Sequence, residues 1–345
     1  MRLRRADCTG PGIRRRRQGK GFTYLDPDGE RVREPEVTTR IAELVIPPAW
    51  EDVWICPYPG GHIQATGIDQ RGRKQYLYHP KWRERQDLQK FRDMVEFARG
   101  LPAMRERVEA DLATDDLSKD HVLACAVRLL DRGLFRIGTE DYAVTNETYG
   151  LATMKKAHVA VQGDALLFDY PAKHAKRQVR QVVDPEVTAV VRKLKARRGG
   201  LDELLAYKQN GRWRDVKSAD INEYLKAASG LDVSAKDFRT WGATVLAAVT
   251  LAASHPAEMS PTKRKRLIAH AVRHVAYYLG NTPAVARASY IDPRVFDRFR
   301  DGYVIDVDLI GDAGDGGTAI QGEVEDAVLD LITGERRSKR LERAA

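Results

Sequence analysis

The chain is poor in the residues that build disulfide frameworks, zinc sites and membrane spans. Its 345 residues include three cysteines, Cys8, Cys56 and Cys125, which stand far apart and form no CxxC pair. This spacing predicts reduced thiols, with neither a disulfide framework nor a zinc site. No apolar run approaches the length that crosses a bilayer, so we expect no membrane partner.

The chain also lacks a secretory signal and a phosphate-binding loop. The N-terminus is rich in arginine but has no apolar core and no cleavage site. No GxxxxGK(S/T) pattern occurs, since Gly19-Lys20 is followed by Gly21. An ATP-driven mechanism therefore has no support, and a cytoplasmic location is expected.

Positive charge is what the chain has in excess. The formal net charge is +9, from 58 Lys and Arg against 49 Asp and Glu. This balance favours a polyanionic partner, although a solvated basic surface is the plain alternative. Residues 1–20 hold eight basic residues against the single acid Asp7. We expect a solvated arm there, which would contact phosphates if the partner is a polyanion.

Residues 21–82 have the pattern of a small β domain. Short runs such as Phe22–Leu25, Val53–Cys56 and Lys74–Tyr78 are separated by turns rich in Gly, Pro and Asp. This alternation predicts a small, mostly antiparallel sheet. A short helix is expected over 41–46, before a pair of prolines.

The pattern changes to helices after residue 82, and we place a domain boundary near residue 85. The chain is then expected to consist of a β-rich domain, 1–85, and a mainly helical domain, 86–345. Helices are expected over 84–100, 102–114, 118–133, 184–197, 218–229, 237–254, 261–279, 284–290 and 322–341. Within the segment 311–345, the glycine-rich run 311–317 predicts a flexible linker before the last helix.

A three-stranded antiparallel meander is expected among these helices. Residues 157–161, 165–169 and 177–183 have strand patterns and are separated by short turns. Lys173 falls in the second of these turns. A small antiparallel sheet followed by a helical domain with its own meander defines the α+β class.

Five polar side chains follow one another along the helical domain in a set that suits attack on a phosphodiester. They are Arg136 in Phe135-Arg-Ile-Gly138, Lys173, Arg239, Asn281 and Tyr290. Arginines hold phosphate oxygens, a lysine supplies a proton, an amide donates a hydrogen bond and a tyrosine attacks phosphorus. Taken singly, each has an ordinary alternative: a surface ion pair, a solvated lysine such as nearby Lys176, or a packed tyrosine.

The ordered set, with the sequence around it, resembles the type IB DNA topoisomerases of the small bacterial and poxvirus type. The matching stretches are Ile46–Trp50, Val53–Pro57, Gly61–Gly67, Gly72–Tyr78, Phe135–Gly138, Asn146–Thr153, Pro171–His174, Asp237–Gly242 and Leu279–Pro283, with Tyr290. The resemblance extends from Pro11 to near Phe296. It implies an isomerase that relaxes supercoiled duplex DNA. One strand is cut through a 3′-phosphotyrosine, rotates and is rejoined without ATP.

The resemblance implies a role for each member of the set. Tyr290 is the nucleophile, and Arg136 and Arg239 neutralise the charge on the phosphate. Lys173 is the general acid for the leaving 5′-oxygen. Asn281 departs from the histidine of most members of the wider family, because it donates a hydrogen bond but is neutral at every pH. We expect neither a metal nor another cofactor, since the arginines supply the charge that Mg²⁺ often supplies.

The resemblance also implies DNA contacts from one strand and the turn before it. Base contacts are assigned to Gln75, Tyr76 and Tyr78, and phosphate contacts to Arg71, Arg73 and Lys74. By the period of two, both tyrosines share one face of the strand and the glutamine lies on the other. Packing of a tyrosine on the sheet is the alternative. The resemblance further implies a monomer that closes as a clamp around double-stranded DNA, associated with the nucleoid.

Two other functions remain open at this point. A tyrosine recombinase or integrase uses the same nucleophile and similar cations to exchange strands, but such enzymes usually carry a helical N-terminal domain and multimerise. A catalytically inactive, architectural DNA-binding protein is the second. The β-rich first domain argues against the recombinase, and the complete set of five side chains argues against the inactive protein.

Overall fold

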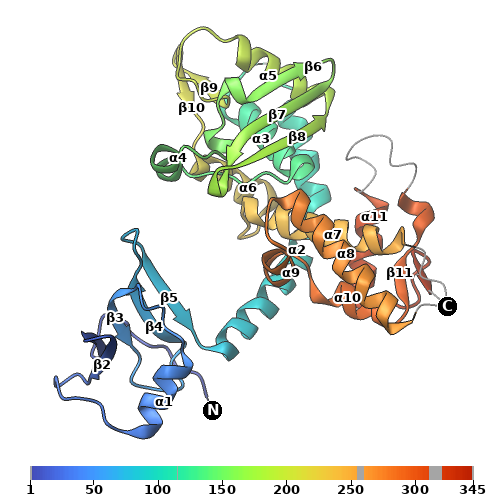
Figure 1. Cartoon of the computed structure of the whole chain (residues 1–345). Helices are drawn as coiled ribbons and strands as arrows, with labels where there is room; N and C mark the ends of the chain where they lie inside the picture. Colours follow the sequence, from blue (N-terminus) through green and yellow to red (C-terminus); the bar gives the residue numbers. More distant parts are fainter. Residues whose placement is uncertain (1, 115, 255–259, 311–320, 344–345) are drawn as a thin grey trace. The chain divides into compact units, whose positions relative to one another are not determined.

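The structure is a computed structural model, and it describes residues 2–114, 116–254, 260–310 and 321–343 (Figure 1). Contacts between residues divide the chain into two units, 1–91 and 92–345. The division falls inside one long helix, α2 (Pro80–Leu112). Within the described ranges, no helix is long and apolar enough to cross a membrane.

The first unit is built on a five-stranded antiparallel sheet with the strand order β2-β1-β3-β4-β5. Its elements are β1 (Ile13–Gln18), β2 (Gly21–Leu25), α1 (Pro35–Glu43), β3 (Glu51–Ile55), β4 (Ile63–Ile68) and β5 (Lys74–Tyr78). The expected antiparallel β-rich region is confirmed.

The two faces of this sheet are covered differently. On one face Ile13, Ile55 and Ala65 pack against Ile41 of α1, and together they form the core of the unit. On the other face a smaller cluster around Trp54 is covered by Ala6, from the segment that precedes the sheet. Alternate strand residues therefore point to the two sides, as the period of two requires.

Two expectations for the first unit are wrong. The solvated arm expected over residues 1–20 contains β1, whose arginine run pairs with both β2 and β3. Ladder hydrogen bonds and the buried Ile13 at its start outweigh the charge of this run. The helix expected over 41–46 begins earlier, with Pro35 in its first turn, and ends at Glu43.

The second unit is mainly helical, as expected. Its helices after α2 are α3 (Lys119–Gly133), α4 (Glu140–Asn146), α5 (Pro185–Ala196), α6 (Ser218–Ser229), α7 (Ala235–Ala252), α8 (Pro261–Leu279), α9 (Pro283–Ser289), α10 (Pro293–Arg300) and α11 (Glu323–Thr333). Short 3₁₀ turns are η1 (Leu151–Thr153), η2 (Lys156–His158), η3 (Lys173–Ala175) and η4 (Val307–Ile310). Most of α7 is buried, so this helix forms the centre of the unit.

The expected meander is confirmed. Strands β6 (Val159–Gln162), β7 (Ala165–Ala172) and β8 (Lys176–Val183) form a three-stranded antiparallel sheet in that order. Turn η3 joins the second strand to the third, so Lys173 lies at a hairpin tip. Two smaller antiparallel pairs were not foreseen: the hairpin of β9 (Ala206–Gln209) with β10 (Arg212–Asp215), and β11 (Tyr303–Ile305) with β12 (Leu341–Arg343).

Two helix boundaries differ from expectation. The helices expected over 84–100 and 102–114 are one helix, because α2 continues through Pro102 with Leu101 and Met104 buried beside it. Tertiary packing there outweighs the hydrogen bond that proline removes. The last helix ends at Thr333, because Gly334 takes a left-handed conformation with φ 88. The linker expected over 311–317 lies outside the described residues.

Candidate active site

The ends of two helices form the frame of the site. Leu134 follows the end of α3 and Gly280 follows the end of α8, and both have left-handed conformations, with φ 48 and φ 65. The last carbonyl groups of a helix have no partner within that helix. They also carry the negative end of the helix dipole. The two helix ends therefore offer acceptors that suit cationic side chains.

Two of the predicted residues donate hydrogen bonds to these carbonyl groups. Arg239 of α7 is buried, and its guanidinium donates to the carbonyl oxygens of Leu134 at 2.5 Å and Leu279 at 2.9 Å. Arg136 donates to the carbonyl oxygen of Gly280 at 3.3 Å. No carboxylate among the described residues forms an ion pair with either arginine. Their positive charges are thus held in place without being neutralised.

A third guanidinium, which the sequence analysis missed, completes this arrangement. Arg180 of β8 is buried and donates to the carbonyl oxygens of Gly133, at 2.7 Å, and Tyr278. Its guanidinium carbon also lies over the ring of Phe135, 5.6 Å from the centroid. The sequence contained a signal for this residue. Arg180 stands two residues before Val182, which is buried, so the period of two places both on the buried face of β8.

Asn281 lies beside these guanidinium groups. Its Oδ1 accepts a hydrogen bond from the guanidinium of Arg136. Because a guanidinium only donates, this contact fixes which end of the amide faces the arginine. The amide nitrogen, Nδ2, is buried and has no hydrogen-bond partner among the residues that the structure describes. It is a donor available to an anionic oxygen.

Tyr290 follows α9 directly and lies beside Arg239, whose guanidinium carbon is 5.4 Å from the centroid of the phenol ring. Burial alone would raise the pKa of this phenol. The charges of Arg239 and then Arg136 outweigh burial and hold the pKa of Tyr290 below its usual value. Burial, followed by the charge of Arg136, lowers the pKa of Arg239.

Lys173 is exposed at the hairpin tip, and it lines a cavity of about 240 Å³ together with Arg136. Thr148 lines the same cavity, and its buried hydroxyl has no hydrogen-bond partner in the described part of the chain. The structure therefore brings all five predicted side chains into one region. Arg136 and Arg239 both donate to the carbonyl oxygen of Leu279, and Arg136 also donates to Asn281. Arg239 contacts Tyr290, and Lys173 lines the same cavity as Arg136.

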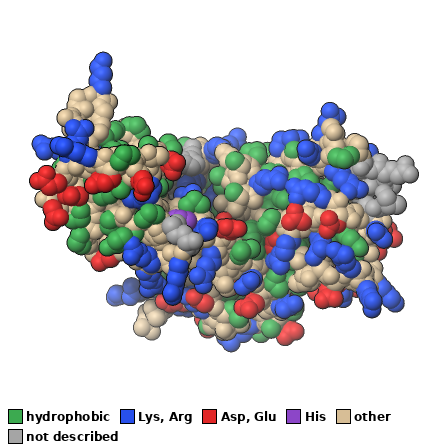
Figure 2. All heavy atoms as spheres, turned by 90° about the horizontal axis from the view of Figure 1, so that it is seen from below, with side chains coloured by type: hydrophobic (Ala, Val, Ile, Leu, Met, Phe, Trp, Pro, Cys, Tyr) green, Lys and Arg blue, Asp and Glu red, His purple; other side chains and the backbone are tan. Residues whose placement is uncertain are grey.

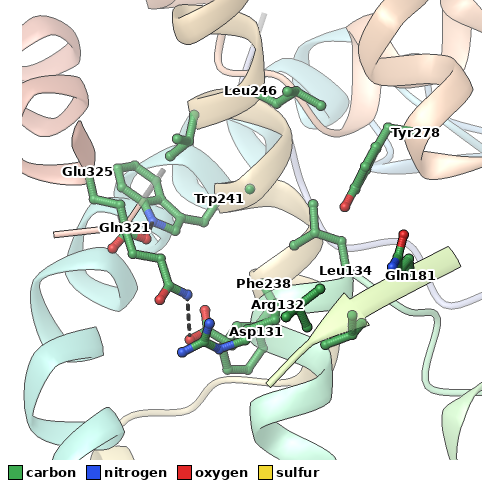
Figure 3. A pocket seen from close by; sticks show the side chains of 14 residues that line it. Asp131, Arg132, Leu134, Gln181, Phe238, Trp241, Leu246, Tyr278, Gln321 and Glu325 are labelled. Carbon is green, nitrogen blue, oxygen red and sulfur yellow. Dashed lines mark hydrogen bonds between the residues drawn. The ribbon is translucent and has the colours of Figure 1, made fainter. Parts of the chain in front are cut away.

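A separate cavity of about 350 Å³ adjoins the same two helix ends but contains none of the five predicted residues (Figure 3). Leu134, Phe238 and Tyr278 form part of its wall. Trp241 donates to Glu325 at 2.7 Å, which ties α7 to α11 at this cavity. None of Arg136, Arg180 and Arg239 lines it. Its one phenol is that of Tyr278, whereas Arg239 lies over the phenol of Tyr290 in the candidate site.

In the first unit, β5 displays two of the predicted DNA-contacting residues. The rings of Tyr76 and Tyr78 are stacked with centroids 6.1 Å apart, and 39% and 38% of these residues are exposed. The ammonium of Lys74 lies 5.9 Å from the ring centroid of Tyr76. Gln75 lies on the other face of the strand and is less exposed. The expected division between the two faces is confirmed.

Asp69 organises the turn before β5, and the sequence analysis did not single it out. Its Oδ1 accepts from the backbone amides of Arg71 and Arg73 at 2.9 and 3.0 Å. Its Oδ2 accepts from the guanidinium of Arg73 at 2.7 Å and from Gln75 at 2.9 Å. The side chain of Arg73 first, and then the backbone amides of Arg73 and Arg71, lower the pKa of Asp69 to about 2. Arg71 stays exposed on the turn.

A half-buried phenol with a lowered pKa, beside guanidinium groups that no carboxylate of the described residues neutralises, suits attack on an anionic ester such as a phosphodiester. The comparisons with known proteins agree. The family model described as eukaryotic DNA topoisomerase I, catalytic core, matches residues 79–301, and the one described as bacterial DNA topoisomerase IB, N-terminal domain, matches residues 21–69.

Individual relatives extend this agreement. The DNA topoisomerase 1B of Acanthamoeba polyphaga mimivirus is 30% identical over 292 residues, which are 81% of this chain and 85% of that protein. The DNA topoisomerase 1B of vaccinia virus (strain Copenhagen) is 20% identical over 301 residues, 84% of this chain and 91% of that protein. The chain belongs to the type IB DNA topoisomerases. It is an isomerase that acts on DNA by cutting and rejoining strands.

Proposed function

We propose that Tyr290 is the nucleophile with which this enzyme relaxes supercoiled duplex DNA. The phenol oxygen forms a bond to the scissile phosphorus, and the bond from phosphorus to the 5′-oxygen breaks. This leaves a 3′-phosphotyrosine and a free 5′-hydroxyl. After the cut strand has rotated about the intact one, the hydroxyl attacks the phosphotyrosine and releases Tyr290. The observation that carries the proposal is the contact of Tyr290 with Arg239, which lowers the pKa of the phenol.

Arg136 and Arg239 stabilise the transition state in this proposal. Their guanidinium groups are held by helix-end carbonyls, so they need little rearrangement when the phosphate oxygens gain charge. Asn281 donates from Nδ2 to a non-bridging oxygen, which gives that buried donor a partner. We propose that this charge and these donors replace a metal ion.

Lys173 is the general acid that protonates the leaving 5′-oxygen. It lies at an exposed hairpin tip and lines the same cavity as Arg136, so it can approach the phosphate from the solvent side. Such acid catalysis is worth about 10²–10⁴-fold. Because the energy of the broken bond is kept in the phosphotyrosine, rejoining needs no ATP.

The first unit binds DNA in this proposal. Base contacts come from Tyr76 and Tyr78 on the exposed face of β5, and from Gln75 once it is released from Asp69. Arg71, Arg73 and Lys74 bind neighbouring phosphates. Domains 1–85 and 86–345 enclose the duplex as a monomeric clamp, and the enzyme works on DNA in the nucleoid. The separate family match to residues 21–69 supports a distinct first domain.

The test is relaxation of a supercoiled plasmid in EDTA without ATP, with Tyr290→Phe run in parallel. Wild-type protein is expected to relax the plasmid, and Tyr290→Phe is expected to bind it without relaxing it. Denaturing the reaction should trap wild-type protein covalently on the 3′ side of a nick. Relaxation by Tyr290→Phe would exclude this nucleophile, and a plasmid left supercoiled by wild type would exclude the proposed reaction.

A further inference from the structure

The N-terminal segment, residues 2–12, is folded onto the sheet of the first unit. Its backbone forms hydrogen bonds from Arg4 to Gly60 O at 2.9 Å and from His62 to Arg4 O at 3.0 Å. The amide of Ala6 donates to Nδ1 of His62 at 2.9 Å. The indole of Trp54 donates to the carbonyl oxygen of Gly10 at 3.1 Å. These four bonds fix the segment along its length.

Two glycines allow the segment to approach the sheet this closely. A Cβ at Gly12 would lie 2.0 Å from the indole nitrogen of Trp54. A Cβ at Gly61 would lie 2.4 Å from the sulfur of Cys56 and 3.3 Å from Ala6. Side chains in these positions would push the segment away, so the local sequence is suited to this packed arrangement.

The segment covers the face of the sheet that carries the exposed tyrosines. Arg14 pairs with Trp54, Trp54 with Thr66, and Thr66 with Tyr76 across neighbouring strands. Residues directly opposite each other in a sheet point to the same side. Trp54, which the segment buries, therefore shares a face with Tyr76, whereas α1 packs on the opposite face.

The side chains that the segment turns outward are cationic. Arg2, Arg4 and Arg5 are exposed, as is Arg16, which shares the face of Arg14 on β1. Ion pairs among the described residues include none of these four, whereas Arg14 pairs with Asp52 at 3.3 Å. The one acid of the segment, Asp7, is bonded to Thr9 instead: its Oδ1 accepts from the amide at 2.9 Å and from the hydroxyl at 2.6 Å.

One of these cations is held in a defined position. The guanidinium of Arg4 lies 3.2 Å from the ring centroid of Tyr58, which is itself 49% exposed. Stacking of this kind leaves the guanidinium N–H groups free at their edges to donate to an anion. The backbone that carries the four cations is held on the side of the sheet that displays Tyr76, and Arg4 is also held through its side chain.

We propose that Arg2, Arg4, Arg5 and Arg16 form a phosphate-binding surface, here called the arm surface, which holds the backbone of the duplex whose bases meet Tyr76 and Tyr78. The inference rests on the proposed function, since it takes duplex DNA as the substrate of this face. The arm surface adds affinity and orientation without reading sequence, because phosphates are the same at every base pair.

The experiment measures duplex affinity against salt concentration in Tyr290→Phe protein, which binds DNA without cutting it. The test variant carries Arg2→Gln and Arg5→Gln. The matched control carries Arg17→Gln and Lys20→Gln, which remove the same charge from exposed positions of the same unit. Arg17 shares the face of Ile13 on β1, which packs on the α1 side of the sheet.

The test variant is expected to weaken binding and to make the slope of log K against log salt shallower by about 1.8, or about 0.9 for each lost phosphate contact. The control is expected to keep the wild-type slope. An unchanged slope in the test variant, or an equal change in both variants, would overturn the arm surface. Failure of the proposed function has a different signature: protein with Tyr290 intact would not relax plasmid at low salt.

Discussion

At the scale of single residues, burial and the charges of nearby arginines act in opposite directions on the pKa of Tyr290. Burial would raise its pKa, but Arg239 and Arg136 lower it below the value near 10 of a free tyrosine. The folded-state pKa is then lower than the unfolded-state pKa. The ionised phenol therefore stabilises the fold at high pH, and this contribution is lost as the pH falls through the folded-state pKa.

This balance predicts an observable titration. The ultraviolet difference in tyrosinate absorbance between wild type and Tyr290→Phe is expected to have its midpoint below pH 10. Arg136→Gln should raise that midpoint, because one of the two nearby charges is lost while Arg239 remains. Arg212→Gln, at an exposed position on β10, is the control and should leave it unchanged. A wild-type midpoint at or above pH 10 would contradict the balance of burial and charge described here.

At the scale of elements, the site depends on how the ends of α3 and α8 are joined. Arg180 donates to Gly133 of the first helix and to Tyr278 of the second. The neighbouring carbonyls, those of Leu134 and Leu279, are the acceptors of Arg239. Arg180 therefore acts as a positioning residue: it sets the distance between the two carbonyls that hold a phosphate-binding side chain.

Arg180→Met removes this link and leaves two helix-end carbonyls without a donor. The rate constant for strand cleavage in a single turnover is expected to fall by about 10- to 100-fold. A displacement of a catalytic group by about 1 Å can slow a reaction by a factor of this size. Duplex affinity should stay constant, and Arg180→Lys should restore part of the rate.

The control for this variant is Arg197→Met. Arg197 is likewise buried and bonded to backbone carbonyls, those of Leu194 at 2.9 Å and Leu204 at 2.8 Å, but none of these residues belongs to the site. It should lower the melting temperature without slowing cleavage. If both variants slow cleavage equally, Arg180 is merely structural.

Elements with strong local signals could be predicted from the sequence. Helix α8 begins with Ser260 and Pro261 and ends before Gly280, and its expected range matches the observed one. Predictions failed where distant partners decide the outcome. The arginines of β1 form a strand only because β2 and β3 lie beside them, and α2 passes Pro102 because the helix is packed there.

The residues of the candidate site differ in the same way, since some could be predicted from the sequence and others depend on distant partners. Arg136, Arg239 and Tyr290 could be found because a reaction that attacks phosphate needs these residue types in one chain. The strand period could place Arg180 on a buried face, but the sequence does not show which carbonyls it binds, and no pattern in the sequence singles out Asp69. A buried strand face and two helix ends give Arg180 its role, and a hairpin turn brings to Asp69 the donors of Arg71, Arg73 and Gln75.

At the scale of the whole molecule, the excess of nine positive charges is spread among acidic groups, and Figure 2 shows Lys and Arg side chains interspersed with Asp and Glu on the face in view. Such a surface attracts a polyanion along many contacts and binds it with strong salt dependence. The charge of this surface does not decide in which direction the cut strand rotates. In the proposed reaction, the torsion stored in the DNA decides that direction.

A reaction driven only by DNA torsion should act on both signs of supercoiling. Positively and negatively supercoiled plasmids are expected to reach the same distribution of relaxed topoisomers in EDTA without ATP. Each phosphotyrosine keeps the energy of the broken bond, and the strand rotates whichever way releases torsion. If one chain suffices, the initial rate should be proportional to enzyme concentration. Relaxation of only one sign would mean that the protein itself biases rotation, and a rate rising with the square of concentration would contradict the monomer.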